Sequence, residues 1–178
     1  MSAHASIAKL GSIMQMAYVP ADFEGALKYW TETIGAGPFF SIEHVKLKEV
    51  NYRGRPSDID FSMMLGYWGD TQIELIRQRN AAPSIFKSWR DQGREGLHHV
   101  CMLVDDIAKA RAACPESLVA IAQEAIVPGG GEVIYVDTGD SGSIVEILKP
   151  TPGTHEFFAM MREAHRTWDG SQPVRRIG

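Results

Sequence analysis

The stretch that decides the fold is Gly96-Leu-His-His-Val-Cys-Met-Leu-Val-Asp-Asp-Ile107. An apolar run typical of a strand is followed by an acidic residue and then by a helix-like segment. The same order occurs earlier in the chain, where Gln15-Met-Ala-Tyr-Val-Pro-Ala-Asp22 matches His99-Val-Cys-Met-Leu-Val-Asp-Asp106 without a gap, at an offset of 84 residues. The repeated order indicates two copies of one structural unit.

A second matched pair supports the duplication. Thr71-Gln-Ile-Glu74-Leu-Ile-Arg77 resembles Ser143-Ile-Val-Glu146-Ile-Leu-Lys149, with a glutamate inside an apolar strand and a basic residue three positions later. The offset is now 72 residues, so the first copy carries 12 additional residues. Two pairs in the same order favour a duplicated unit over coincidence.

Each copy is expected to form one βαβββ module. The predicted limits are residues 12–80 for the first module, 81–95 for a linker helix, 96–150 for the second module, and 151–178 for a C-terminal helix and tail. Strands are expected at 13–19, 39–50, 58–67, 71–78, 97–104, 118–126, 132–137 and 143–149. Helices are expected after the N-cap Asp22 as far as Gly35, and at 84–92, 106–113 and 154–167.

Composition excludes several classes of protein. The net charge is −4 and no basic run is present, so nucleic acid is not an expected partner. Arg175-Arg176 is interpreted as part of a solvated tail. No apolar stretch suits a membrane span or a secretory signal, and two cysteines make no disulfide framework. We therefore expect a cytoplasmic protein, with Cys101 as a buried thiol.

Four polar residues occupy equivalent repeat positions, and strand alternation places them on matching faces. They are Gln15 and His99 in the first strands, and Glu74 and Glu146 in the last strands. A pseudo-twofold axis between the copies would bring them together as two carboxylates, an amide oxygen and an imidazole, a set that suits a divalent ion. The alternative is that the glutamates face solvent on a half-exposed sheet. His98 has the opposite strand phase and is interpreted as a packing or hydrogen-bonding histidine.

At these residues the chain resembles the vicinal-oxygen-chelate superfamily, which includes glyoxalase I and methylmalonyl-CoA epimerase, over roughly residues 12–150. The 96–107 stretch looks like the second-module opening of the epimerases. Ala26-Leu-Lys-Tyr-Trp and Ile34-Gly-Ala-Gly-Pro-Phe are also similar. The resemblance implies an α+β fold in which two tandem βαβββ modules form a curved, barrel-like mixed sheet. It also implies that Gln15, Glu74, His99 and Glu146 are the metal ligands.

The ligand set resembles that of some glyoxalases I, whereas the epimerases usually have His at the first position and Gln at the second. The resemblance implies one divalent ion per chain, zinc first, with manganese, cobalt, nickel or magnesium as alternatives. It implies an isomerase, epimerase or lyase that removes a proton next to the carbonyl of a small chelated substrate. Glu146 is the first choice of base and Glu74 the second. The alternative is a metal-free, ligand-sequestering protein of the bleomycin-resistance type.

Two further expectations concern the surroundings of the site. The pocket walls are expected to include Met63, Leu65, Trp68 and the Tyr52-Arg53-Gly54 turn, with a purely structural core role as the alternative. Exposed strand edges in a βαβββ unit favour a homodimer. Neither nucleic acid nor a membrane is an expected partner.

Overall fold

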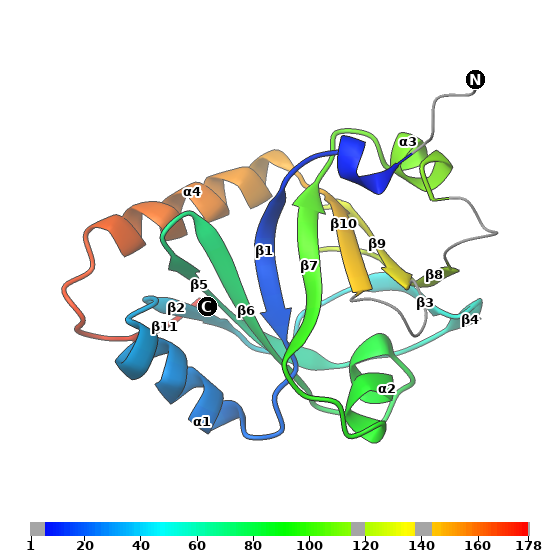
Figure 1. Ribbon diagram of the computed structural model, residues 1–178. Helices are drawn as coiled ribbons and strands as arrows, with labels where there is room; N and C mark the ends of the chain where they lie inside the picture. Colours follow the sequence, from blue (N-terminus) through cyan, green and yellow to red (C-terminus); the bar gives the residue numbers. More distant parts are fainter. Residues whose placement is uncertain (1–5, 115–119, 138–143, 178) are drawn as a thin grey trace.

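One mixed sheet organises the chain, which the computed structural model describes over residues 6–114, 120–137 and 144–177. The sheet curls into an open, barrel-like shape without closing (Figure 1). Its strands are β1 (Ile13–Tyr18), β2 (Phe39–Ile42), β3 (Lys48–Tyr52), β4 (Arg55–Pro56), β5 (Phe61–Trp68), β6 (Thr71–Gln78), β7 (Leu97–Leu103), β8 (Ala120–Ile126), β9 (Glu132–Asp137), β10 (Ile144–Lys149) and β11 (Val174–Arg176). The predicted α+β fold with a curved sheet is confirmed.

The strand order shows the duplication directly. β1 and β7 pair antiparallel at the centre, β6 runs parallel to β1, and β10 runs parallel to β7. From this centre the order is β1-β6-β5-β2 on one side and β7-β10-β9-β8 on the other. Each half therefore repeats the same arrangement. The limits predicted for the modules and the linker stay a prediction.

The helices begin and end where local chemistry requires. They are α1 (Phe23–Lys28), α2 (Ile85–Asp91), α3 (Ile107–Ala112) and α4 (Pro152–Arg166). Asp22 caps α1 by accepting from the Gly25 amide, and Asp106 caps α3. α1 continues as a π-helical segment to Gly35, whose left-handed backbone ends it as predicted. Within the described ranges, no helix is long and apolar enough to cross a membrane.

The single strand predicted over 39–50 is wrong. β2, which pairs with β5, ends at Ile42, and residues 43–47 then lead across to the other half of the sheet, where β3 pairs with β8. The Val45 amide donates to the Phe61 carbonyl on the way, and His44 has a positive φ of 49°. Regular pairing stops because this segment must bridge the two halves. The β3–β4 hairpin supplies the extra length of the first copy.

The polar C-terminal segment is also not a free tail. β11 pairs parallel with β2, placing Arg175 beside Phe40 and Arg176 beside Ser41. The interpretation of Arg175-Arg176 as part of an unpaired tail is therefore wrong, although Arg176 is exposed to solvent and Arg175 is half-buried. Of the predicted strands 118–126 and 143–149, positions 118, 119 and 143 lie outside the described residues.

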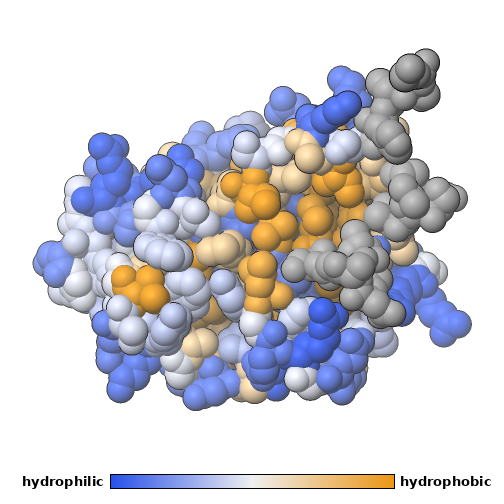
Figure 2. All heavy atoms as spheres, in the orientation of Figure 1, coloured by the Kyte–Doolittle hydropathy of each residue, from blue (hydrophilic) through white to orange (hydrophobic). Residues whose placement is uncertain are grey.

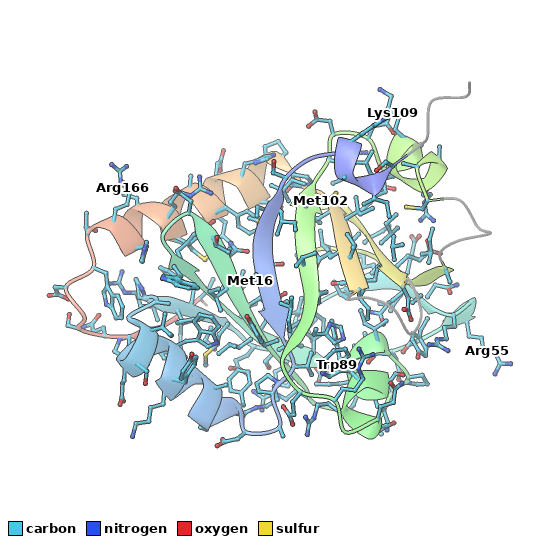
Figure 3. All side chains as sticks on the ribbon, viewed as in Figure 1. Met16, Arg55, Trp89, Met102, Lys109 and Arg166 are labelled. Atoms are coloured by element: carbon cyan, nitrogen blue, oxygen red, sulfur yellow. The ribbon has the colours of Figure 1, made fainter. Side chains whose placement is uncertain are left out.

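The two faces of the sheet are covered differently. α1 and α3 pack on the outer face at either side of the β1–β7 centre (Figure 1). Met16 and Met102 lie on this face (Figure 3) and belong to the clusters beneath α1 and α3. Hydrophobic side chains gather where β1, β7 and β10 run (Figure 2). α4 packs on the inner side of β5, with Met161 buried against Phe40 and Leu65.

We expect Gly131→Ala to destabilise the fold. A Cβ at Gly131 would lie 2.6 Å from the Lys149 carbonyl oxygen and 2.9 Å from Val127 Cγ2, so the paired backbone must shift. The expected loss is about 1–3 kcal/mol of unfolding free energy, measured by chemical denaturation. Gly153→Ala is the control, because a Cβ there would lie 3.8 Å from Thr151 Oγ1, an ordinary contact distance. Equal stability of both variants would contradict this packing.

Candidate metal centre

The four predicted ligands lie on four adjacent strands, β6, β1, β7 and β10. Ala17 of β1 is paired with Glu74 on one side and with His99 on the other. Gln15 is paired with Cys101, which is in turn paired with Glu146. Paired residues share a face of the sheet. All four predicted side chains therefore project from the inner face of the sheet centre.

Three of them form a tight buried group. One ligand atom each from Glu74, His99 and Glu146 lies within 4.8 Å of the others. His99 Nε2 is 2.8 Å from Glu146 Oε2 and 3.5 Å from Glu74 Oε2. The imidazole is fully buried, and the two carboxylates are almost so. Neither glutamate faces solvent, so the half-exposed alternative is wrong. The group could hold a metal ion.

Two buried carboxylates need a positive partner. Burial raises the pKa of the Glu74 carboxyl; the contact with His99 opposes this rise and the charge of Glu146 adds to it. Burial alone would lower the pKa of His99, but Glu146 and Glu74 together raise it to about 9. In the metal-free site the protonated imidazole therefore supplies the positive charge between the carboxylates.

His98 fixes the orientation of the His99 ring. Its Nε2 lies 3.4 Å from the Ile85 carbonyl oxygen, which can only accept, and its Nδ1 lies 2.8 Å from His99 Nδ1. Burial lowers the pKa of His98 well below its usual value and keeps it neutral, with Nδ1 as an acceptor. His99 must then donate from Nδ1. This leaves His99 Nε2 directed at the carboxylates, and confirms His98 as a hydrogen-bonding histidine.

Gln15 is held by a second hydrogen-bond chain. Its Nε2 donates to Gln72 Oε1 at 2.7 Å, and Gln72 Nε2 donates to the Tyr67 hydroxyl at 3.2 Å. With the amide nitrogen engaged, Gln15 Oε1 is buried and forms no hydrogen bond with any described residue. His99 Nε2 is likewise buried, and close to Glu146 without alignment for a hydrogen bond. A buried amide oxygen without a hydrogen bond, together with an imidazole nitrogen directed at two carboxylates, fits the donor set of a divalent ion.

Three residues near this group were not predicted as part of it. Cys101 lies between Gln15 and Glu146 on the inner face, and Tyr135 of β9 is paired with Glu146. The Tyr135 ring packs edge-on against His99 at 5.4 Å. Gln72 and Cys101 share the strand phase of Glu74 and His99, so alternation could have placed them. Tyr135 could be found only from strand pairing. Burial raises the pKa of both Cys101 and Tyr135, so each stays protonated.

The group formed by the four predicted ligands, called the metal-ligand group below, borders a cavity of about 550 Å³. Gln15, Glu74 and Glu146 line its buried floor, and residues 43–47 line its exposed mouth. Met63 and Leu65 form part of the wall, as predicted. The volume lies in the range of small-molecule sites.

Two predicted wall elements lie elsewhere. The Tyr52-Arg53-Gly54 turn belongs to the β3–β4 hairpin and does not line this cavity. Trp68 has the opposite strand phase from Met63 and Leu65, and half of its surface is exposed on the outside of the sheet. It packs there on Trp30, with ring centroids 6.1 Å apart.

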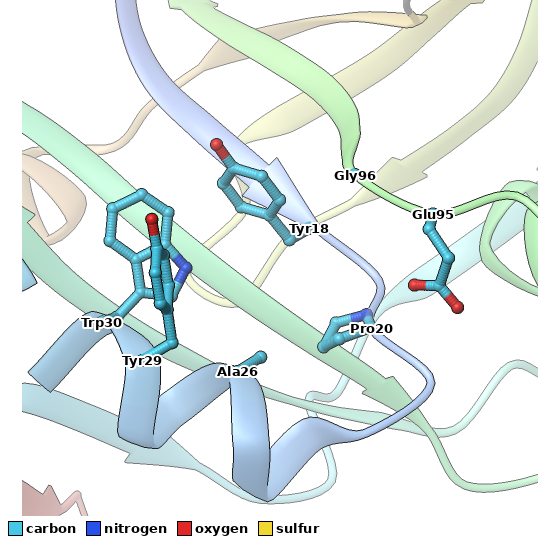
Figure 4. A pocket seen from close by; sticks show the side chains of 7 residues that line it. All are labelled: Tyr18, Pro20, Ala26, Tyr29, Trp30, Glu95 and Gly96. Atoms are coloured by element: carbon cyan, nitrogen blue, oxygen red, sulfur yellow. The ribbon is translucent and has the colours of Figure 1, made fainter. Parts of the chain in front are cut away.

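Beside Trp30 lies a second, smaller hollow of about 320 Å³. Figure 4 shows Tyr18, Tyr29 and Trp30 on one side of it and Glu95 on the other. Glu95 is 2.6 Å from an Arg90 nitrogen, and no histidine or cysteine lines this hollow. It therefore lacks the donor set of the sheet centre.

Comparisons with known proteins agree with this architecture. A hypothetical protein from Bacillus halodurans C-125 is 12% identical with a TM-score of 0.56, covering 79% of this chain and 95% of that one. Methylmalonyl-CoA epimerase from Mycobacterium tuberculosis is 14% identical with a TM-score of 0.55, covering 83% of this chain and 93% of that one. At these identities the similarity shows the fold alone. Comparison with curated proteins gives no significant match.

The family model described as glyoxalase/bleomycin resistance protein/dioxygenase superfamily matches residues 14–138. This match covers most of the chain, including β1, β6 and β7 with three of the four predicted ligands. The chain belongs to the glyoxalase/bleomycin resistance protein/dioxygenase superfamily.

Proposed function

We propose that this protein is a divalent-metal-dependent enzyme that removes a proton next to a carbonyl group of a small chelating substrate. The reaction would be an isomerisation, an epimerisation or a lyase reaction. The observation that carries the proposal is the buried Glu74–His99–Glu146 group at the floor of a cavity that opens to the surface. Two buried carboxylates beside one imidazole keep an excess of negative charge even when His99 is protonated, and a divalent cation would compensate it.

In this proposal Gln15 Oε1, Glu74, His99 Nε2 and Glu146 hold the ion. The set has three oxygen donors and one imidazole, which suits zinc as the first choice and also manganese, cobalt, nickel or magnesium. The ligand pattern of glyoxalase I supports zinc. The fold shared with methylmalonyl-CoA epimerase supports the same class of proton transfer.

The bound ion would act as a Lewis acid on two substrate oxygens and stabilise the negative charge that develops on them. Proton removal is assigned to the chain's own carboxylates, Glu146 first and Glu74 second, because both border the cavity. The raised pKa of Glu74 brings it closer to the range in which a carboxyl group both takes up and returns a proton.

We also propose that the protein forms a homodimer with a small carbonyl compound as its substrate. The two ends of the sheet are the short strands β11 and β4, and their unpaired main-chain groups are available for pairing with a second copy. Sedimentation at micromolar concentration would decide this point.

The first test combines metal content with proton exchange. We expect about one divalent ion per purified chain. The loaded protein should place deuterium from D₂O next to the carbonyl of at least one member of a panel of 2-oxo thioesters, methylglyoxal–thiol adducts and small hydroxy acids, measured by NMR. Glu146→Gln and Glu74→Gln should slow this exchange at least about 100-fold, and the slower variant identifies the base.

Glu132→Gln is the matched control, because Glu132 is a partly exposed strand glutamate paired with Lys149 at 2.9 Å. It should keep both metal and exchange. If the protein takes up no metal and Glu146→Gln binds ligands as the unaltered chain does, the enzyme proposal is wrong. The apolar cavity would then favour the ligand-sequestering alternative.

A second prediction concerns protons released on metal binding. The pKa of His99 is about 9 in the metal-free site, so the ring is protonated at pH 7.5. Only the neutral ring can bind a metal through Nε2, and binding should release about one proton per ion or more. Calorimetry in buffers with different ionisation enthalpies measures this number. An enthalpy that does not depend on the buffer would show that His99 is not a ligand.

A third prediction tests the positioning of Gln15. Gln72→Leu removes the acceptor that holds the Gln15 amide nitrogen, and we expect metal affinity to fall about 10- to 100-fold. Gln72→Glu keeps an acceptor oxygen and should retain more affinity than Gln72→Leu. Competition with a chromogenic chelator gives both values. Affinity equal to that of the unaltered chain in Gln72→Leu would contradict a ligand role for Gln15.

A further inference from the structure

The cavity above the metal-ligand group is apolar along most of its depth. Its ionisable groups lie at the two ends, with Glu74 and Glu146 at the buried floor and Glu43, His44 and Lys46 at the exposed mouth. Apolar side chains from both halves of the sheet form the wall between these ends. The part of a substrate that extends from the metal position toward the mouth would therefore contact mainly hydrophobic side chains.

Aromatic rings continue this surface outward from the metal-ligand group. Tyr135 packs edge-on against His99 and against Phe86, with centroids 5.4 and 6.1 Å apart. Phe86 in turn lies 5.4 Å from Phe61. The aromatic wall therefore begins directly beside the proposed metal position, where the chelating oxygens of a substrate would lie.

α4 supplies further rings to the cavity wall. Phe157 and Phe158 line the cavity with centroids 6.5 Å apart, and both stay only half-buried. Phe157 rests edge-on against Phe40, which anchors it to β2. α4 follows the family match, which ends at residue 138. These rings are therefore not part of the segment that the family model matches.

The mouth is poorly suited to a strongly anionic tail. Glu43 lies 2.6 Å from an Arg79 nitrogen, and His44 Nδ1 lies 2.9 Å from Asp60. Lys46 is the one cationic group of the described lining with no ion pair to a described residue. Several phosphates or carboxylates would need more cations than this rim offers.

We propose that the substrate is a compact molecule in which an apolar, ring-sized body is attached directly to the two chelating oxygens. Phe157 and Phe158 of α4 are the residues that select this body. The inference rests on the proposed function and names its substrate class. It disfavours substrates recognised mainly through a phosphorylated nucleotide or a charged peptide.

Two metal-chelating probes with the same oxygen pair test this inference. Acetohydroxamate carries a methyl group and benzohydroxamate carries a phenyl ring. On the zinc-loaded protein, calorimetry should show benzohydroxamate binding at least about tenfold tighter. Phe158→Ala should remove most of this advantage and leave acetohydroxamate affinity within about twofold. Met160→Ala is the control, because Met160 is exposed on α4 and does not line the cavity.

Each outcome decides a different point. Equal affinity for the two probes, with zinc bound, overturns the substrate class and leaves the proposed function intact. Failure to bind zinc, manganese, cobalt, nickel or magnesium overturns both, and metal analysis shows that case separately. If Phe158→Ala does not fold, Phe158→Leu keeps an apolar side chain without the ring and should still weaken benzohydroxamate selectively. An unchanged ratio in a folded Phe158→Leu and in Phe157→Leu would show that α4 does not select the ring.

Discussion

Two carboxylates buried side by side in the middle of a sheet repel each other unless a positive charge lies between them. Glu74 and Glu146 are in this position, and much of the surrounding structure is arranged around the requirement. His99 meets it with a proton when no ion is present. The Gln15 amide nitrogen bonds to Gln72 and the His98 ring bonds to His99, which leaves Gln15 Oε1 and His99 Nε2 available to the centre.

The duplicated sheet makes this arrangement possible, and the departures from duplication give it a pocket. Equivalent strands from the two halves meet at β1 and β7, which brings equivalent side chains to one point. The segments around the opening have no counterpart in the other half. Residues 43–47 cross its mouth, and α4 covers the inner side of β5. The repeated strands thus build the polar floor and part of the apolar wall, while residues 43–47 and α4 complete the wall and the mouth.

This division explains what could be predicted from the sequence. Strand alternation is a local property, so a repeat sufficed to place Glu74, His99 and Glu146 on one face. The prediction of Trp68 as a wall residue broke the same rule. Its strand phase is opposite to that of Met63 and Leu65, so alternation places it on the outer face. The break after Ile42 and the pairing of β11 could not be foreseen, because both depend on strands distant in the sequence. The role of Gln72 depends on the register between β1 and β6.

The contact between Ile85 and His98 links the helix that joins the two halves to the candidate ligand. The Ile85 amide donates to Gln123 of β8, and its carbonyl oxygen lies beside His98 Nε2. Both groups belong to the main chain, so a side-chain replacement at this position cannot delete them. On the α2 side, only a displacement of the helix as a body would break the link, whereas on the sheet side it depends on the side chains of His98 and Gln123. The orientation of the His99 ring is thereby tied to the position of a helix as well as to its neighbouring histidine.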